Sequence, residues 1–281
     1  MPDLGGLIGE LLRLVGEVLG SSSLRLGVGP TLAVVAVLLV LLQLVARPTT
    51  RWTSRDPGGL GAAGHAMALA AESGTDVVVS LGTAGIARST SAFGRMQTFA
   101  ALDVLDHVGR TAARAGVPVR VTTNDPLTAV AVEVVLDGVH RRTATGERRH
   151  RSRAEYQGDG RGVAAGMALA RRRAPAAAFG IGGMGEEAVL LASGLVDGAG
   201  LATIGTADAA QAPAALLAGG GALIGPQLLE VAADLRADTV ARTGVYAADR
   251  LLLLLIIVLV AGTALALGGI VDPRAFLVGP A

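Results

Sequence analysis

Two long apolar runs constrain this chain more than any other feature of its sequence. Residues 27–46 and residues 251–270 each hold 20 consecutive residues without a charged side chain. A helix rises about 1.5 Å per residue, so a run of this length covers roughly the 30 Å of hydrocarbon in a bilayer. The sequence therefore predicts a transmembrane helix near each end of the chain, with the lipid bilayer as its first partner.

The composition agrees with a membrane protein and excludes several kinds of site. The mean hydropathy is +0.55 and 51% of the residues are hydrophobic, which is high for a soluble chain of 281 residues. Only 2% of the residues are aromatic, which leaves few rings on which nucleic-acid bases stack, so we expect no nucleic acid among the partners. The chain has no cysteine, which excludes disulfides, thiolate metal ligands and cysteine nucleophiles.

Arginines predict which side of the membrane holds the central part of the chain. The outer flanks of the two runs offer only Arg13, Arg25 and Arg274, and the inner flanks carry more. Positively charged flanks stay on the cytoplasmic side of a membrane. We therefore expect the body on the cytoplasmic side of a cell membrane, with both termini outside. The inner arginines are Arg47, Arg51, Arg55, Arg236, Arg242 and Arg250.

The segments outside the two runs are short. Residues 1–26 repeat apolar side chains at helical spacing, which predicts an amphipathic helix that either lies on the membrane surface or self-associates. Residues 271–281 form a short tail. In the second run, Ala264 and Gly268 are small residues four positions apart, a spacing that lets helices approach closely. We expect a homo-oligomer.

The body between the runs repeats itself after 100 residues. The stretch AMALA corresponds to GMALA, which lies 100 residues later, and Gly82 corresponds to Gly182. The order of elements also repeats, because each stretch reads as helix, buried strand, glycine turn, helix and second strand. We therefore predict two similar α/β units, over residues 47–140 and 158–250.

Continuous apolar strands that alternate with helices are buried on both faces, as in parallel sheets. The fold class that we predict is α/β and Rossmann-like, with a mainly parallel sheet from the two units, flanked by the two transmembrane helices. An alternative places residues 188–232 in the bilayer, but Asp197 and Asp208 interrupt the apolar runs there. The predicted strands are residues 76–82, 117–125, 176–182 and 200–208.

A connector between the units, residues 141–157, is rich in arginine. It admits two interpretations: a contact with anionic lipid headgroups or nucleic acid, or a solvated loop that joins the units. Of the two partners, lipid fits a tethered body better. The candidate lipid-binding residues are Arg141, Arg142, Arg148, Arg149, Arg151 and Arg153.

The segment FGIGGMG contains the spacing G-x-G-x-x-G at Gly180, Gly182 and Gly185. After a strand, such glycines can bring a backbone close to a phosphate at a helix N-terminus. However, Glu186 and Glu187 follow at the start of the next helix, and their charges would repel a phosphate. The alternative is that the glycines only let a strand and a helix pack closely.

If both units belong to one sheet, their strand ends meet at the carboxyl edge, where open α/β sheets bind ligands. The sequence predicts a crevice there, lined by the glycine turns, by two Thr-x-Asp sequences that end the second strands, and by the segment GDGRG. For GDGRG the alternative is a simple turn before a helix. The candidate ligand-binding residues are Gly82, Thr83, Gly85, Thr123, Asp125, Asp159, Arg161, Gly180, Gly182, Gly183, Gly185, Thr206 and Asp208.

No catalytic set can be assembled from the sequence. The four histidines are scattered without paired metal-ligand spacing. Neither a G-x-x-x-x-G-K-[ST] loop nor a G-x-S-x-G elbow is present. We therefore assign no catalytic residue, no metal ligand and no cofactor.

Four segments carry a resemblance: GDGRGVAAGMALA, GIGGMGEEAVLLASG, GTADAAQAP and RTGVYAADRLL. Because of these segments, the region from Arg51 to the second apolar run resembles a bacterial family of membrane-anchored proteins of unknown function. The resemblance implies an α/β body next to a membrane helix, and it implies no activity. We favour an oligomeric scaffold or interaction protein at the cytoplasmic face. The alternatives are a membrane-tethered nucleotide-binding or sensing domain that uses the glycine turns, and a transport component.

Overall fold

The computed structural model describes residues 38, 60–61, 63–143, 152–171, 175–185, 188–196, 201–217, 221–236 and 239–267. The chain divides into two compact units, one formed by Thr49–Val245 and the other by Met1–Pro48 together with Tyr246–Ala281. The predicted amphipathic helix, the first apolar run except Leu38, and the tail of residues 271–281 lie outside the described residues.

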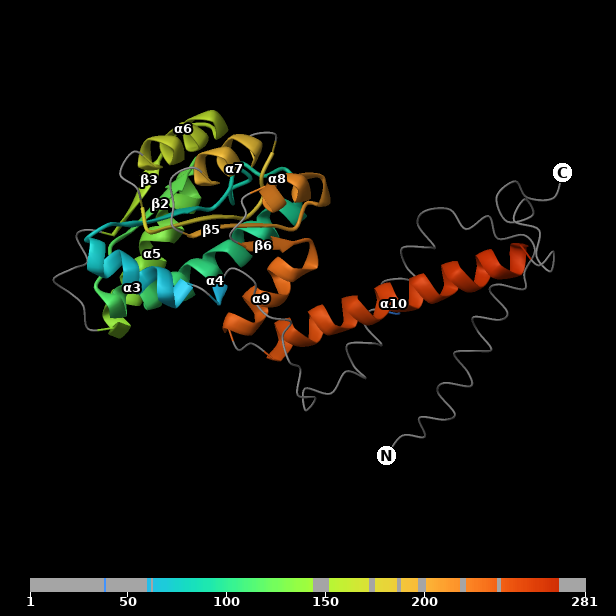
Figure 1. The fold of residues 1–281 in the computed structure, drawn as a ribbon. Helices are drawn as coiled ribbons and strands as arrows, with labels where there is room; N and C mark the ends of the chain where they lie inside the picture. The colour runs from blue at the N-terminus through green and yellow to red at the C-terminus, as the bar shows by residue number, and fades with distance from the viewer. Residues whose placement is uncertain are drawn as a thin grey trace. The chain divides into compact units, whose positions relative to one another are not determined.

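The unit Thr49–Val245, which we call the body, is built on a sheet of six parallel strands. Their order is β3-β2-β1-β4-β5-β6, so the chain starts in the middle, moves to one edge, returns to the middle and moves to the other edge (Figure 1). This order is that of Rossmann-like folds. The strands are β1 (Val77–Ser80), β2 (Val119–Thr123), β3 (Arg153–Tyr156), β4 (Ala177–Ile181), β5 (Leu201–Thr206) and β6 (Gly221–Ile224).

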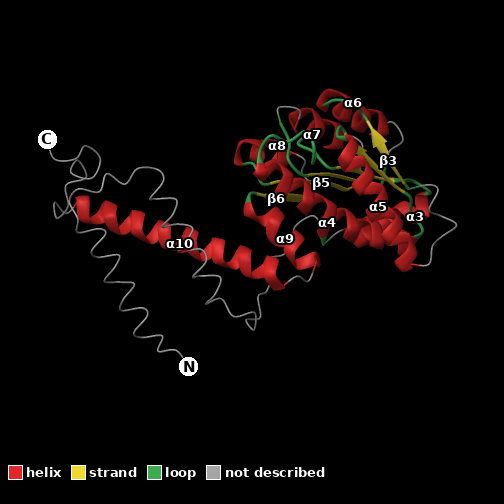
Figure 2. Cartoon of the chain, turned by 180° about the vertical axis from the view of Figure 1, so that it is seen from behind, coloured by secondary structure: helices red, strands yellow, loops and turns green. Residues whose placement is uncertain are grey.

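Helices cover both faces of this sheet, as Figure 1 and the reverse view in Figure 2 show. One face is covered by α3 (Ala63–Ser73), α4 (Ala92–Ala115), α5 (Pro126–Thr143) and α9 (Pro226–Arg236). The other face is covered by α6 (Gly160–Arg171), α7 (Ala188–Val196) and α8 (Ala212–Leu217), which follows the short helix η3 (Ala209–Gln211).

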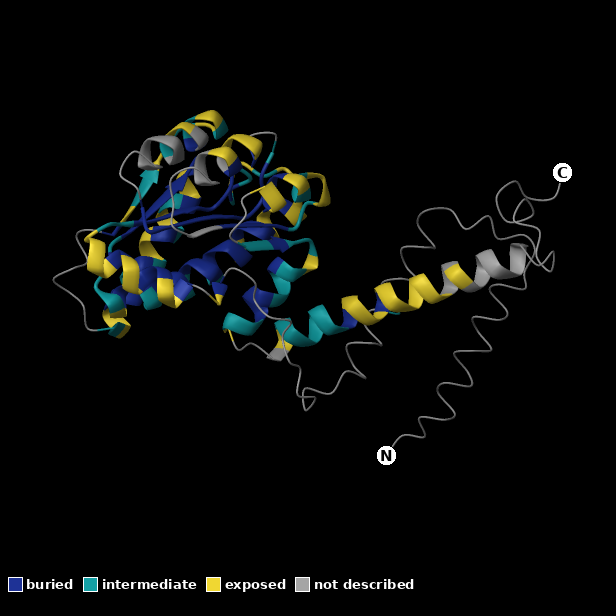
Figure 3. Ribbon diagram, in the orientation of Figure 1, coloured by how far each residue is buried: buried dark blue, intermediate teal, exposed yellow. Residues whose placement is uncertain are grey.

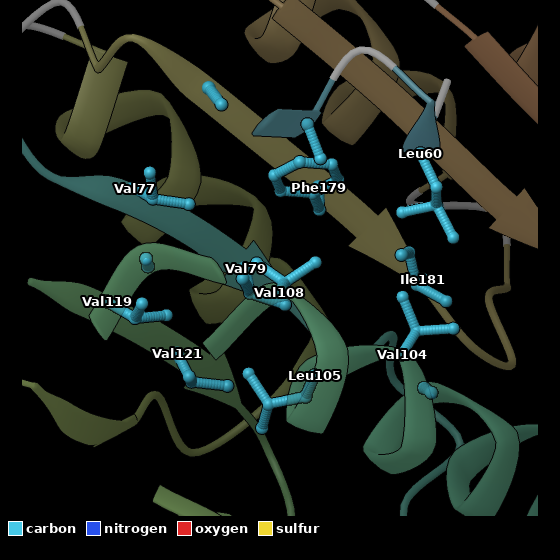
Figure 4. Close-up of a cluster of buried hydrophobic side chains, with 14 of the residues drawn as sticks. Leu60, Val77, Val79, Val104, Leu105, Val108, Val119, Val121, Phe179 and Ile181 are labelled. Carbon is cyan, nitrogen blue, oxygen red and sulfur yellow. The ribbon is translucent and has the colours of Figure 1, made fainter. Parts of the chain in front are cut away.

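Among the described residues, the hydrophobic core consists of two clusters, one on each face of the sheet, and successive residues of the central strands alternate between them. Val77, Val79 and Phe179 pack with α4 and its neighbouring helices, in the cluster that Figure 4 shows. Val78 and Ala178 pack on the opposite face with α7 and α8. The central strands are therefore buried on both faces, as their continuous apolar sequences predict.

The predicted α/β fold with a parallel sheet is confirmed, and four predicted strands correspond to β1, β2, β4 and β5. The two edge strands, β3 and β6, were not predicted. Both are only four residues long, and β3 (RAEY) carries charge and is partly exposed. The arginine-rich segment of residues 141–157 therefore contains the end of α5 and an edge strand.

The pairing of β1 with β4 reproduces the sequence shift of 100 residues. Val77 lies opposite Ala177, and Ser80 lies opposite Gly180. The first half of the body, β1–β3 with α3, α4 and α5, therefore meets the second half, β4–β6 with α6, α7 and α8, at equivalent positions. In addition, α3 contacts β4, and α6 contacts β1 and β2, so each half places its first helix over strands of the other.

The helix α10 (Thr239–Leu267) contains most of the second apolar run. Its large apolar side chains from Leu252 to Ile257, together with Val260, are exposed. Figure 3 accordingly colours much of the described part of α10 as exposed. Among the residues that the structure describes, no helix is long and apolar enough to span a membrane.

Candidate functional site

The centre of the body has the geometry at which open α/β sheets place ligands. The neighbouring strands β1 and β4 are followed by α4 and α7, and these helices cover opposite faces of the sheet. The chain therefore leaves the two strands in opposite directions, which creates a switch point at their carboxyl ends. Residues 81–91 and residues 182–185 meet there.

The two glycine turns contact each other at this switch point. The backbone N–H groups of Thr83 and Ala84 both donate to the carbonyl oxygen of Gly183, at 2.8 and 3.0 Å. A Cβ on Gly82 would lie 2.3 Å from that same oxygen, and a Cβ on Gly182 would lie 2.4 Å from a backbone oxygen of the other turn. Their φ angles are 73° and 128°, in the region that favours glycine. The glycines thus let two backbones pack directly on each other.

Asp125 fixes the loop after β1 to the start of α5. Its Oδ2 accepts hydrogen bonds from the N–H groups of Ile86 at 3.0 Å and Ala87 at 3.1 Å, and from the N–H and hydroxyl of Thr128 at 2.9 and 2.6 Å. The side chain is fully buried, and a Cβ on Gly85 would lie 2.5 Å from its Cβ. Burial raises the pKa of Asp125, but the hydrogen bonds from Thr128, Ala87 and Ile86 outweigh it and lower the pKa. The carboxylate is therefore held in its charged form.

Two buried oxygens beside this loop have no hydrogen-bond partner among the described groups. They are Oδ1 of Asp125 and Oδ1 of Asn124. The amide nitrogen of Asn124 donates to the carbonyl of Thr83 at 3.0 Å, so Asn124 also holds the first glycine turn. Two acceptors of this kind would suit a donor, such as a bound water or an amino group, and would repel a phosphate.

The two Thr-x-Asp sequences form the same turn at the ends of β2 and β5. The hydroxyl of Thr123 accepts the N–H of Asp125 at 3.3 Å, and the hydroxyl of Thr206 accepts the N–H of Asp208 at 3.2 Å. Each aspartate then caps the next helix, Asp125 at α5 and Asp208 at η3 through the N–H of Ala210. The sequence correspondence is thus also a correspondence of hydrogen bonds.

Gln97 of α4 connects the end of β5 to the first half of the body. Its Oε1 accepts the N–H of Ala207 at 2.9 Å and lies 3.5 Å from the hydroxyl oxygen of Thr206. Only 3% of Gln97 is exposed, so this hydrogen bond is shielded from water and helps to fix the two halves in place.

The segment GDGRG lies at the end of β3 and begins α6. Oδ1 of Asp159 accepts the N–H of Gly162 at 2.6 Å, which caps the helix. Arg161 is exposed, and no ion pair joins it to Asp159 among the described contacts. The guanidinium of Arg88 donates to the carbonyl oxygens of Asn124 at 3.1 Å and Gly158 at 2.6 Å. Arg88 therefore ties together the loops after β1, β2 and β3.

The structure brings most of the candidate residues to one edge of the sheet, in three groups. The glycine turns and Asp125 meet at the switch point, Thr206 and Asp208 lie beside it at the end of β5, and Asp159 and Arg161 lie further along at β3. Gly180 is a residue of β4, and Gly185 accepts the N–H of Ala188. Sequence reasoning missed Gln97, Asn124 and Thr128, since no motif marks them and only the fold brings them to this edge.

Arginines of the predicted lipid-binding segment form ion pairs where the structure describes them. Arg141 pairs with Asp137, Arg142 with Asp106, and Arg153 with Glu155 at 2.9 Å. Arg148, Arg149 and Arg151 lie outside the described residues. Within the described ranges, no three histidine, aspartate or glutamate side chains group together as metal ligands.

The chain belongs to the family described as a domain of unknown function (DUF6754), whose model matches residues 23–274. No curated protein and no solved structure matches the chain. The match confirms the expected membership of an uncharacterised family. It covers the body together with both apolar runs, so the family unit is larger than the α/β fold.

Proposed function

We propose that this chain is an oligomeric scaffold or interaction protein, anchored at both ends in a bacterial cell membrane with its body on the cytoplasmic side. The observation that carries the proposal is α10, where six consecutive apolar residues, Leu252 to Ile257, are each 40–58% exposed. Consecutive helical residues point around the whole circumference, so this segment is apolar on every side. A bilayer accommodates such a surface and water does not.

Tyr246 and Arg250, which precede this segment, favour a membrane boundary at its start. The guanidinium of Arg250 lies 5.0 Å from the ring centroid of Tyr246, and its Nε donates to the tyrosine hydroxyl at 3.0 Å. Tyrosine and arginine place an apolar stem in lipid and a polar end in water, so they are typical of membrane interfaces. We place the boundary at Tyr246 and Arg250, one turn apart.

The glycine turns favour a scaffold over a nucleotide-binding domain. In a dinucleotide site, free backbone N–H groups of the first turn face the phosphates. Here the N–H groups of Thr83 and Ala84 already donate to Gly183. A nucleotide would have to separate two backbones that are bonded to each other.

A second candidate function is the sensing of a small ligand that offers hydrogen-bond donors. The two unpartnered oxygens of Asn124 and Asp125 favour it, because buried acceptors without partners are costly. Such a ligand would be a protonated amine and not a nucleotide. The transport alternative loses support, since residues 188–232 contribute β5, β6 and helices to the body.

We also infer that the two halves of the body are copies of one α/β unit. The register of 100 residues between β1 and β4, the mirrored strand order and the matching Thr-x-Asp turns support this inference. A duplicated unit also explains why two glycine turns meet at the centre of the sheet.

The proposed function is tested on the full chain in native membranes. We expect the chain to resist extraction at alkaline pH, and we expect a defined oligomer after solubilisation in mild detergent, without added ligand. Recovery of the chain in the soluble fraction would contradict the anchor, and a monomer would contradict the scaffold. A ligand that binds the folded state raises the midpoint of thermal unfolding. Because we expect no nucleotide to bind, nucleotides at millimolar concentration should leave this midpoint unchanged. A rise with ammonium-type ligands alone would favour the sensing candidate.

A further inference from the structure

We propose that two copies of this chain associate through the outer surface of α4, with the two α4 helices antiparallel about a twofold axis at Phe99. This inference rests on the self-association in the proposed function, and it names the surface and the partner. We call Phe93, Met96 and Phe99 the α4 stripe. The stripe is apolar, unusually exposed, and flanked by charges that fit a second copy.

The α4 stripe is exposed to a degree that packing within the body does not explain. Phe93, Met96 and Phe99 are 46%, 43% and 50% exposed, and they recur every three residues on one side of the helix. The chain has only four phenylalanines, so two of its largest apolar side chains lie on this surface. The opposite side of α4 supplies the buried core residues Val104 and Leu105.

A second row of exposed apolar side chains lies on the neighbouring helix. Leu127, Val130 and Val134 of α5 are 49%, 60% and 67% exposed. The helices α4 and α5 pack on each other, and both begin at the carboxyl edge of the sheet. Six side chains that are about half exposed together present on the order of 500 Å² of apolar surface. With a polar rim, that area approaches the roughly 800 Å² per partner of a stable interface.

Charges on α4 select an antiparallel second copy. Arg95 lies four residues before Phe99, and Asp103 lies four residues after it. A twofold axis at Phe99 that runs perpendicular to the helix brings Arg95 of each copy to Asp103 of the other. A parallel arrangement would instead bring like charges together, which is unfavourable.

Arg95 and Asp103 differ in their contacts within the body. No ion pair or side-chain hydrogen bond of Arg95 occurs among the described contacts, and the residue is exposed. Asp103 pairs with Arg236 of α9 at 3.7 Å, with 24% of its side chain exposed. A carboxylate has acceptor capacity for a second arginine. An acidic residue at this point also disfavours an anionic bilayer as the occupant of the surface.

The lack of native cysteine allows a direct test in the full chain. Phe99→Cys places one thiol on the axis. For helices packed 8–10 Å apart, the Cα atoms on the contact line lie about 3.4–5.4 Å apart, and the upper part of this range overlaps the Cα separations that a disulfide bridges. Under mild oxidation in native membranes, we expect disulfide-linked dimers. The matched control is Leu69→Cys on α3, where the native side chain is 46% exposed, and we expect it to remain monomeric on the gel.

A charge exchange keeps the proposal falsifiable if Phe99→Cys weakens the apolar contact. Arg95→Asp alone and Asp103→Arg alone should each weaken the dimer about tenfold, because two ion pairs per dimer become like-charge contacts. The double variant restores both pairs with the charges exchanged, so it should recover the affinity of the original chain. Additive losses in the double variant would overturn the proposal.

The outcomes separate this inference from the proposed function. Equal crosslinking of Phe99→Cys and Leu69→Cys, or a chain that forms its oligomer without crosslinking at Phe99, overturns the α4 interface and leaves the scaffold in place. Crosslinking at Phe99 to a different protein overturns a second copy as the occupant. A specific dimer at Phe99 in a chain that alkaline buffer extracts supports the interface and contradicts only the membrane anchor.

Discussion

The ends of β2 and β5 carry the same Thr-x-Asp turn in very different surroundings. In both, a threonine hydroxyl accepts the N–H of the aspartate, and the aspartate caps the following helix. Asp125, however, is fully buried and also binds two N–H groups of the loop after β1, whereas Asp208 is partly exposed and its described side-chain hydrogen bond is the cap at Ala210.

The two turns therefore share their local geometry and differ in the number of hydrogen bonds that their aspartates accept. The first turn joins three segments of the body, and the second joins a strand to a short helix. We therefore expect equivalent substitutions in the two halves to have equal effects where they touch the centre of the sheet, and unequal effects at the two aspartates.

The largest effect should come from the glycines at the centre. Gly82→Ala and Gly182→Ala each place a Cβ within 2.4 Å of a backbone oxygen at a positive φ. Backbone strain and overpacking together should destabilise the body by roughly 3–5 kcal/mol for either variant. Gly225→Ala is the control, because its φ is 64° and the space around it is open, so it should cost about 1–2 kcal/mol. Chemical denaturation followed by far-UV circular dichroism measures all three, and a large gap between Gly82→Ala and Gly182→Ala would break the equivalence of the halves.

The aspartates should differ by more than the glycines do. Asp125→Ala removes the acceptor of the N–H of Ala87 and of the buried N–H and hydroxyl of Thr128, and it leaves the N–H of Ile86 with the Thr128 hydroxyl alone, which should cost about 2–4 kcal/mol. Asp208→Ala removes a helix cap and should cost about 0.5–1 kcal/mol. The same denaturation measurement compares them. Equal losses would mean that the buried contacts of Asp125 add nothing to its role as a cap.

Acid should act on the first turn through Asp125. Its pKa is lowered in the folded state, so its charge stabilises the fold above the ordinary carboxyl pKa of 3.8, and this contribution is lost as the pH falls through the folded value. We expect the stability difference between the original chain and Asp125→Asn to be constant from pH 7 to about pH 5, and to shrink below about pH 4. A difference that stays constant down to pH 2 would show that the folded body does not hold the Asp125 carboxylate in its charged form.

The smallest effect should come from the threonines, where the two turns are alike. Thr123→Val and Thr206→Val each remove a hydroxyl that accepts one N–H at 3.3 or 3.2 Å. Each should cost about 1 kcal/mol, and the two losses should agree within about 0.5 kcal/mol. Hydrogen exchange of the amides of Asp125 and Asp208 gives a local reading of the same bonds.

The centre of the fold could be predicted from the sequence because its strands have a clear sequence signal. β1, with VVV, and β4, with AAFGI, are buried on both faces, so their apolar runs are continuous. The edge strands β3 and β6 could not be recognised. Each pairs with a strand on one side only and is less buried, so its residues need not be apolar. Charged residues such as Arg153 and Glu155 therefore occur there.

The meeting of the candidate residues at one edge of the sheet was predictable, and the contacts between them were not. The glycines and the Thr-x-Asp sequences mark strand ends, and topology alone brings strand ends to one edge. The direct bonding of one glycine turn to the other was not foreseen, because the spacing G-x-G-x-x-G describes both a phosphate loop and a close backbone contact. Gln97 was missed because its role comes from a helix that reaches across to β5.

The exchange of first helices between the halves has a consequence for how the body holds together. Because α3 lies over β4 and α6 lies over β1 and β2, each half would expose strand surface if it stood alone. The two halves therefore resemble two domain-swapped subunits that exchange their first helices, except that one polypeptide contains both. A cut between β3 and α6, at residues 157–159, should give two fragments that remain bound to each other, as separate subunits do, although the chain no longer connects them.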